Sequence, residues 1–145
     1  MAPSSVPINV ADVIRKAQHS LRVETDHALR NAGMTAPQYF ALAALAAQPG
    51  LSGAALARRC FVTPQTMTGV IANLAANGLI TRQADPEHGR VIQTHLTAQG
   101  SALLAKARVL VERVEANMLR DIDPVEREAL MDLLLQCAEA LAKKK

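Results

Sequence analysis

The chain has 145 residues, half of them apolar, and a net charge of +3 from 16 basic and 13 acidic side chains. This size fits one compact domain, and the apolar content excludes an intrinsically disordered chain. Alanine, leucine and valine dominate the apolar residues, with two Phe, one Tyr and no Trp, a mixture that favours helices over sheets. The mild positive charge suits a polyanionic partner without requiring one.

The sequence disfavours three classes of protein. Residues 1–7 lack the basic start and apolar run of a secretory signal, and no stretch is apolar enough to cross a membrane. Cys60 and Cys137 lie far apart and match neither a disulfide framework nor a metal site. We therefore expect one domain over residues 1–145 in the cytoplasm, without a metal, a cofactor or a membrane partner.

Helix start and stop signals are clear in the first fifty residues. Apolar residues at helical spacing predict a helix over residues 9–31, which stops at Gly33, a residue suited to a left-handed C-cap. The segment Thr-Ala-Pro-Gln at residues 35–38 has the pattern of a capping box. It opens a second helix, which we expect to end at Ala47 before a Pro-Gly pair.

The next two helices are short and closely spaced. Ser52 is an expected N-cap for a helix that reaches only to about Cys60. Thr63 caps the following helix, with Pro64 at the first helical position, where its missing N–H is tolerated. That helix stops at Asn77-Gly78. Two capped helices joined by about three residues predict a helix-turn-helix.

A hairpin and two long helices complete the predicted order. Residues 79–84 and 90–96 contain β-branched residues on either side of a loop rich in Asp, Pro and Gly, which predicts a β-hairpin. Thr97 caps a long helix with one apolar stripe. Residues 123–126 have the pattern of a second capping box, which opens a last helix that runs to residue 143.

One face of the helix over residues 64–77 has an unusual composition. Its side chains are short, uncharged and rich in hydrogen-bonding groups, and they are Gln65, Thr66, Thr68, Gly69, Ala72 and Asn73. Such a face can lie in a DNA major groove, where Gln and Asn can pair with adenine edges. A merely solvated face would more often carry Lys and Glu. Taken alone, this face fits either role.

Basic side chains on the hairpin and just before the helix over residues 64–77 also favour contact with DNA. Arg82 lies on the first arm, and Arg90 lies at the tip, where an arginine can enter a narrow minor groove. An exposed hairpin with incidental charges is the alternative, which its place directly after a helix-turn-helix disfavours. Arg58 and Arg59 are candidates for phosphate contacts.

The segment from residue 51 to residue 100 resembles the MarR family of bacterial regulators, named for multiple-antibiotic resistance. Several motifs carry the resemblance together: Leu56-Ala57, Val62-Thr-Pro-Gln-Thr-Met-Thr68, Leu74 with Asn77-Gly-Leu-Ile80, Arg82, Asp85-Pro-Glu-His-Gly-Arg90 and Leu96-Thr-Ala-Gln-Gly100. The long flanking helices also fit this family, so that the resemblance covers nearly the whole chain.

The resemblance implies a mainly α fold, a winged helix-turn-helix of six helices with a β-hairpin wing. Dimerisation helices at residues 9–31 and 97–143 would interlock with those of a second copy, and residues 35–96 would form the winged lobe. The implied function is that of a homodimer that binds double-stranded DNA at a pseudo-palindromic operator, as a ligand-responsive repressor. The helix over residues 64–77 would occupy the major groove and the wing the minor groove.

At the matched positions the resemblance also implies roles in the wing. Arg90 is the expected minor-groove residue, and Asp85 is its support in the wing, expected to hold an arginine in place. Many members carry an arginine just before this position, where this chain has Gly89. The wing tip therefore has fewer charges than is usual in the family.

Many members of the family bind small phenolic or other apolar effectors between the dimer region and the winged lobe. The resemblance places Tyr39, Phe40 and His19 near such a pocket, although core packing also accounts for the two aromatic residues. His19, Glu24 and His27 do not predict a metal site, because their spacing does not bring all three onto one helix face.

Two other classes of function remain as alternatives. A small cytoplasmic enzyme would need catalytic residues, and a Cys60 pair with His88 or His95 rests on residue types alone. We therefore expect no catalytic residue and an inert thiol at Cys60. A winged-helix module for protein contacts would present an apolar or acidic face on the helix over residues 64–77, whereas this face is polar and close to basic residues.

Overall fold

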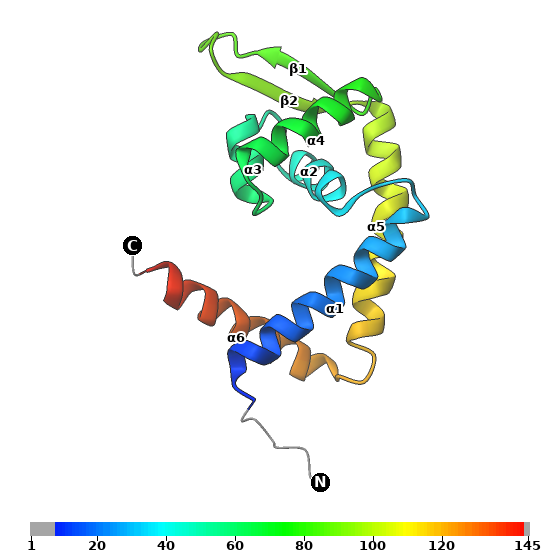
Figure 1. The fold of residues 1–145 in the computed structure, drawn as a ribbon, viewed down its shortest axis with the longest axis vertical. Helices are drawn as coiled ribbons and strands as arrows, with labels where there is room; N and C mark the ends of the chain where they lie inside the picture. Colours follow the sequence, from blue (N-terminus) through cyan, green and yellow to red (C-terminus); the bar gives the residue numbers. More distant parts are fainter. Residues whose placement is uncertain (1–7, 144–145) are drawn as a thin grey trace.

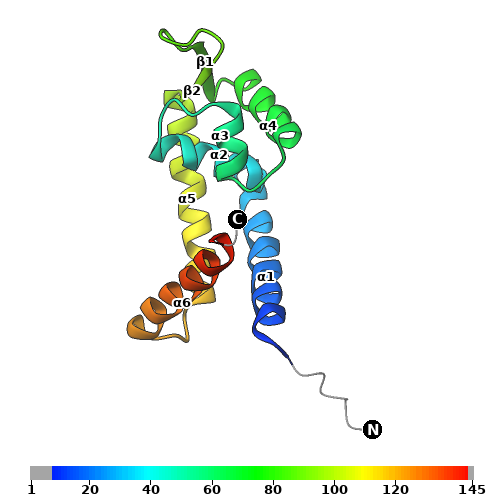
Figure 2. The same ribbon diagram turned by 90° about the vertical axis from the view of Figure 1, so that its left-hand side faces the viewer.

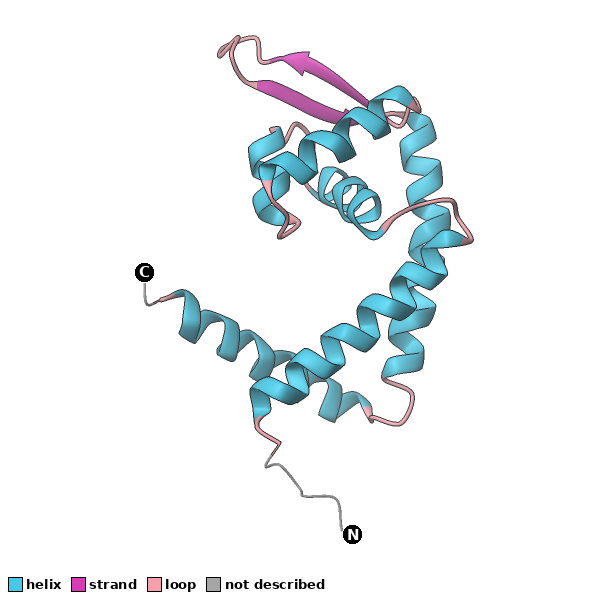
Figure 3. Ribbon diagram, in the orientation of Figure 1, coloured by secondary structure: helices cyan, strands magenta, loops and turns pink. Residues whose placement is uncertain are grey.

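The computed structural model describes residues 8–143; the expectation about residues 1–7 falls outside this range. A winged lobe stands at one end of the molecule in Figure 1, above two long helices, α1 (Val10–Arg30) and α5 (Ala98–Met118). The last helix, α6 (Pro124–Ala142), turns back from the far end of α5. The mainly α fold with one small hairpin, shown in Figure 3, confirms the predicted fold class.

The helix α1 begins at a side-chain cap and ends at the predicted glycine. Asn9 begins the helix by accepting the backbone N–H of Asp12 at 2.9 Å. At the other end Gly33 adopts a φ of 69°, and the N–H of Met34 bonds to the carbonyl oxygen of Leu29 at 3.1 Å. This left-handed turn is the C-terminal stop that the sequence predicts.

The winged lobe consists of α2 (Ala36–Ala47), α3 (Gly53–Arg59), α4 (Pro64–Ala76) and the hairpin. Thr35 and Gln38 form the predicted capping box at the start of α2, with both reciprocal hydrogen bonds present. The core lies among these helices and the ends of α1 and α5 that meet them; its fully buried large side chains include Leu29, Leu42, Leu45, Leu56, Met67 and Leu74.

The hairpin strands β1 (Ile80–Ala84) and β2 (Ile92–Leu96) pair antiparallel, with Ile80 opposite Leu96. The second strand starts two residues later than the predicted residue 90, which is a small correction. The reason is that Val91 closes the loop: its N–H bonds to the carbonyl oxygen of His88, and its own carbonyl accepts from Asp85 N, each at 2.8 Å.

The start of α5 packs closely against the hairpin. Thr97 caps α5 by accepting the N–H of Gly100 at 3.0 Å, and its hydroxyl donates to the carbonyl oxygen of Gly78 at 2.6 Å. A Cβ atom at Gly100 would overlap the carbonyl group of Leu79. Glycine is therefore required at this position by close backbone approach.

At the start of α6 Asp123 accepts two backbone N–H groups, from Val125 and Glu126. The return bond from the Glu126 side chain is absent, so that the predicted capping box is only half formed. A single acceptor already satisfies two amides here, and Glu126 stays exposed.

No residue of α6 is buried in the single chain, and α6 has no extensive contact with the other described elements. Large apolar side chains are nevertheless exposed on α6 and on the first half of α1; they include Val10, Val13, Ile14, Leu130, Leu133, Leu134 and Leu141. No helix within residues 8–143 is long and apolar enough to cross a membrane.

Candidate nucleic-acid interface

The face of the helix over residues 64–77 that is predicted to contact DNA, called the reading face below, lies on the exposed side of α4. Met67, Ile71 and Leu74 are buried on the opposite side, and this burial holds the helix against the lobe. All six residues of the reading face are exposed: Gln65, Thr66, Thr68, Gly69, Ala72 and Asn73. The face is thus polar, uncharged and free of long side chains, which permits close approach to a nucleic acid.

The hydrogen bonds of this face differ from residue to residue. The hydroxyl of Thr68 donates to the carbonyl oxygen of Pro64 at 2.9 Å, so that only its acceptor capacity faces outward. Thr66 is tied to the helix cap Thr63 at 2.9 Å. Gln65 forms no side-chain hydrogen bond within the described range and is free to contact a partner. Asn73 instead accepts a bond of 2.7 Å from Gln38 of α2.

The hairpin projects from the end of the lobe that lies farthest from α6 (Figure 2). Arg90 is exposed in the loop at its tip, as predicted for a wing residue. Arg82 lies elsewhere: it sits opposite the buried Thr94 in β2, and its Nη2 atom would lie 3.9 Å from a Cβ on Gly53. The two arginines therefore occupy the tip of the wing and the middle of its first strand.

Asp85 organises the wing loop, but not through an arginine. Its Oδ1 accepts the N–H groups of Glu87 (2.8 Å) and His88 (3.3 Å), and its Oδ2 accepts from Gln93 Nε2 at 3.1 Å. These bonds, chiefly the one from Glu87, lower the pKa of the Asp85 carboxyl. The expected arginine partner is wrong for this structure, because two backbone amides and Gln93 are the hydrogen-bond partners of the carboxylate within residues 8–143.

The two basic residues at the end of α3 have different surroundings. Arg58 is exposed, whereas Arg59 Nη1 donates to Gln48 Oε1 at 2.9 Å. Burial raises the pKa of the neighbouring Cys60 thiol, although the charge of Arg59 acts in the opposite direction. A raised pKa lowers the thiolate fraction, which agrees with the expected inert thiol.

Phe61 is a feature of the turn that sequence reasoning missed. Its φ is 55°, and the N–H of Val62 bonds to the carbonyl oxygen of Ala57 at 3.1 Å, which closes a Schellman motif after α3. Glycine is the usual residue at such a left-handed position, so that the sequence has no signal for this motif. The Phe61 ring is 96% exposed.

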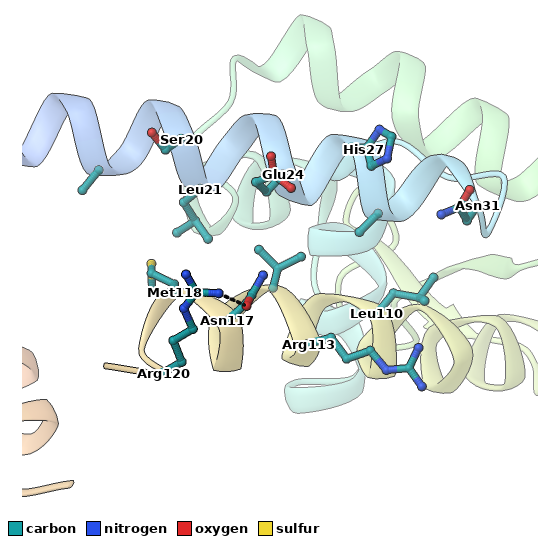
Figure 4. Close-up of a pocket in the computed structure, with 13 residues that line it drawn as sticks. Ser20, Leu21, Glu24, His27, Asn31, Leu110, Arg113, Asn117, Met118 and Arg120 are labelled. Carbon is teal, nitrogen blue, oxygen red and sulfur yellow. Dashed lines mark hydrogen bonds between the residues drawn. The ribbon is translucent and has the colours of Figure 1, made fainter. Parts of the chain in front are cut away.

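A cavity of about 510 Å³ lies between α1 and α5 (Figure 4). Leu21 points from α1 toward α5, and Arg113 and Arg120 lie on the α5 side. The lining combines apolar side chains with polar and basic ones: Ala17, Ser20, Leu21, Glu24, His27, Ala28, Asn31, Leu110, Arg113, Val114, Asn117, Met118 and Arg120.

None of the three residues expected at an effector pocket lines this cavity. Tyr39 is buried in the core, and Phe40 lines a smaller hollow of about 330 Å³ beside Cys60 and Phe61. His19 is exposed on α1, with Arg22 at 3.4 Å. The cavity between α1 and α5 faces a different side of α1 and has no lining residue from α2, so that the role expected for these three residues stays a prediction.

Comparison with known proteins identifies the family. The model of the MarR family matches residues 32–91. The HTH-type transcriptional repressor Rv2887 of Mycobacterium tuberculosis is 39% identical over 109 residues, which cover 74% of this chain and 78% of that protein. The chain belongs to the MarR family.

A further relative and two solved structures are also similar to this chain. The transcriptional regulator HosA of Escherichia coli O111:H- is 31% identical over 107 residues, or 74% of this chain and 79% of HosA. The structure of Rv2887 with salicylic acid is 31% identical, covers 91% of this chain and 98% of its own, and has a TM-score of 0.75. The transcriptional repressor CouR bound to a 23-mer DNA duplex is 25% identical, covers 90% and 92%, and has a TM-score of 0.82.

Proposed function

We propose that this MarR-family chain represses transcription as a homodimer that binds a pseudo-palindromic operator and releases it when a small phenolic or other apolar ligand binds. Residues 35–96 form the DNA-binding lobe, and the helices within 9–31 and 97–143 form the dimer. One observation carries the proposal. The exposed face of α4 is polar and uncharged and lies beside a projecting hairpin with Arg90 at its tip.

The predicted contact residues other than Asn73, which is treated below, each have a place in this arrangement. Gln65, Thr66 and Thr68 would enter the major groove near the start of α4, and Arg90 would enter the minor groove. Arg82, in the middle of β1, and the exposed Arg58 would bind phosphates, whereas the guanidinium of Arg59 already donates one hydrogen bond to Gln48. Asp85 would support the wing through the loop amides that it binds.

The exposed apolar surface supports a homodimer. A helix with many exposed leucines that makes little contact with its own subunit requires a partner to remove that surface from water. A second copy offers the same surface, and a two-fold pair would place two α4 helices in opposite senses. Obligate interfaces of this kind are larger and more apolar than transient ones.

The cavity between α1 and α5 supports a small-molecule effector. Its volume lies within the range of about 300–1,000 Å³ that is usual for ligand pockets. Leu21, Leu110 and Val114 could contact an aromatic ring, and Arg113 or Arg120 could pair with a carboxylate. The relative Rv2887 binds salicylic acid, a ring with a phenol and a carboxylate. We infer an aromatic acid as the effector class here.

We infer that the chain acts by binding and not by catalysis, since its relatives are named as transcriptional repressors and regulators. Double-stranded DNA, a second copy of the chain and the effector are the partners in this proposal. In this proposal the protein binds its operator DNA in the cytoplasm.

Footprinting on the DNA upstream of the protein's own gene tests the proposal, with and without salicylic acid. We expect a protected region with two-fold symmetry that salicylic acid shortens or removes. Benzyl alcohol, which has a ring without a carboxylate, serves as the control ligand. Absence of any sequence-specific protection, there or on a random pool, would contradict DNA recognition. Protection unaffected by aromatic acids would contradict the effector alone.

A further inference from the structure

One side chain of the reading face has its orientation set from outside the helix-turn-helix. Gln38, in the first turn of α2, accepts the backbone N–H of Thr35 at its Oε1, at 3.0 Å. A backbone N–H is only a donor, so that the Gln38 atom facing it must be the amide oxygen. The Nε2 group therefore lies on the other branch, where it donates to Asn73 of α4 at 2.7 Å.

The same reasoning fixes the amide of Asn73. The atom that accepts from Gln38 must be Oδ1. Asn77, one turn farther along α4, has Nδ2 at 2.8 Å from the backbone carbonyl oxygen of Asn73 and at 3.3 Å from its Oδ1. The acceptor capacity of Oδ1 is thus used inside the protein. Nδ2 of Asn73 bonds to no residue within 8–143, and Asn73 is exposed. Its outward side therefore offers two donor hydrogens.

We propose that Gln38 is a positioning residue for DNA recognition: it fixes Asn73 as a donor for a hydrogen-bond acceptor on DNA. This inference rests on the proposed function. An asparagine that pairs with adenine must accept from N6 as well as donate to N7, and the engaged Oδ1 prevents the first of these bonds. The groups that match Asn73 are phosphate oxygens and acceptor edges, such as guanine O6 and N7 or thymine O4.

The substitution Gln38→Glu separates the two roles of Gln38. A glutamate keeps the capping box, because its carboxylate accepts the Thr35 N–H as the amide oxygen does. It cannot donate to Asn73, whose amide should then turn to donate Nδ2–H to the carboxylate and present Oδ1 outward. We expect unchanged thermal stability. The affinity for a duplex selected by the wild-type protein from a random pool should fall by about five- to tenfold, the loss of one hydrogen bond.

The added negative charge is controlled by a double-mutant cycle with Asn73→Ala. If Gln38 acts through Asn73, most of the loss caused by Gln38→Glu disappears in the Asn73→Ala background, and only a salt-dependent remainder persists. The neutral variant Gln38→Met should likewise weaken binding only when Asn73 is present. Equal losses in both backgrounds would overturn the proposal.

The variant Asn73→Ala alone distinguishes the two sources of the acceptor. A phosphate contact predicts an equal loss for every operator point mutant, whereas a base contact predicts relaxed preference at one base pair in each half-site. Unchanged affinity for all duplexes would overturn the proposal.

A measurement without DNA keeps this inference separate from the proposed function. In 15N correlation spectra of the free protein, the side-chain NH2 resonances of Gln38 should shift in Asn73→Ala and stay unchanged in Gln65→Ala. No shift in Asn73→Ala would overturn the contact itself. If the shift occurs but the wild-type protein selects no duplex, the proposed function fails. If it selects a duplex but the cycle shows no coupling, only the role of Gln38 fails.

Discussion

The guanidinium of Arg127, in the first turn of α6, donates from Nη2 to the carbonyl oxygen of Leu119, the C-cap residue of α5, at 2.7 Å. Its Nε donates to the carbonyl oxygen of Ile122, also at 2.7 Å. Carbonyl groups at the end of a helix lack partners within that helix. One side chain therefore satisfies the end of α5 and ties it to the start of α6.

Replacing Arg127 with methionine keeps much of the aliphatic stem but removes both hydrogen bonds. We expect the orientation of α6 relative to α5 to become less fixed. The proposed dimer should weaken by about 1–3 kcal/mol, the cost of leaving the carbonyl groups without a charged donor. Analytical ultracentrifugation at micromolar concentration measures this. Arg120→Met is the control, since Arg120 has only exposed contacts with Asp121 and Asn117. A monomeric wild-type protein would contradict the dimer itself.

Arg90→Ala should weaken operator binding by about 1–3 kcal/mol if the guanidinium enters the minor groove. The exposed side chain supports no core, so that the melting temperature should not change. Titration at fixed salt measures the effect. Arg15→Ala removes an equal charge from α1, where Arg15 pairs with Asp12, and should leave DNA binding nearly unchanged. Unaltered affinity in Arg90→Ala would show that the wing tip does not touch DNA.

Gln65→Ala should relax base preference at symmetric positions in both half-sites, which we expect about 34–36 Å apart. Gln65 is exposed and uncommitted within the described chain, and a two-fold dimer makes each contact twice. Arg58→Ala should instead lower affinity for all sequences alike and reduce the salt slope by about one. Titrations against operator point mutants at two salt concentrations separate these results. If Gln65→Ala behaves as the wild type on every duplex, α4 is not the reading helix.

Phe61→Gly should raise the free energy of unfolding by about 1 kcal/mol, because glycine adopts the left-handed conformation at C′ without the steric cost of a side chain. The ring is almost fully exposed, so that little burial is lost. Urea unfolding measures the change. Gly78 occupies the equivalent position after α4, with a φ of 71°. In Gly78→Ala the new Cβ atom would lie 3.0 Å from Gln99 Oε1 in this left-handed conformation, so that this substitution should destabilise the protein. A stability loss in Phe61→Gly would show that the ring has packing contacts in solution.

The stability of the wing loop should depend on the protonation of Asp85 only in strong acid. Folding lowers the pKa of Asp85, so that its contribution to stability is fully present above the unfolded value of 3.8 and is lost as the pH falls through the lower folded pKa. Hydrogen exchange at the amides of Glu87 and His88 should therefore stay slow at neutral pH. In Asp85→Ala both amides lose the Oδ1 atom that accepts them, and exchange there should accelerate; Asp121→Ala, in an exposed turn, should leave these amides unchanged. Loss of their protection near neutral pH in the wild type would contradict the assignment.

Helix starts could be predicted from the sequence because their signals are local. Thr35, Ser52, Thr63 and Thr97 each accept a backbone N–H three residues farther along the chain, and such a bond needs no help from the rest of the fold. The same holds for the reading face of α4, since helical spacing alone decides which side chains share a side. Phe61 is the exception: the glycine that would mark its left-handed turn is absent.

Contacts between distant segments depended on the tertiary structure. Helical spacing along α4 placed Asn73 on the reading face, but its partner Gln38 lies 35 residues away. Only the packing of α2 against α4 decides which amide atom of Asn73 faces outward. The cavity likewise combines α1 with α5, and its lining cannot be assigned before their packing is known. Sequence spacing determines which residues lie on one face of a helix. Which atoms then meet depends on how the helices pack around the shared core.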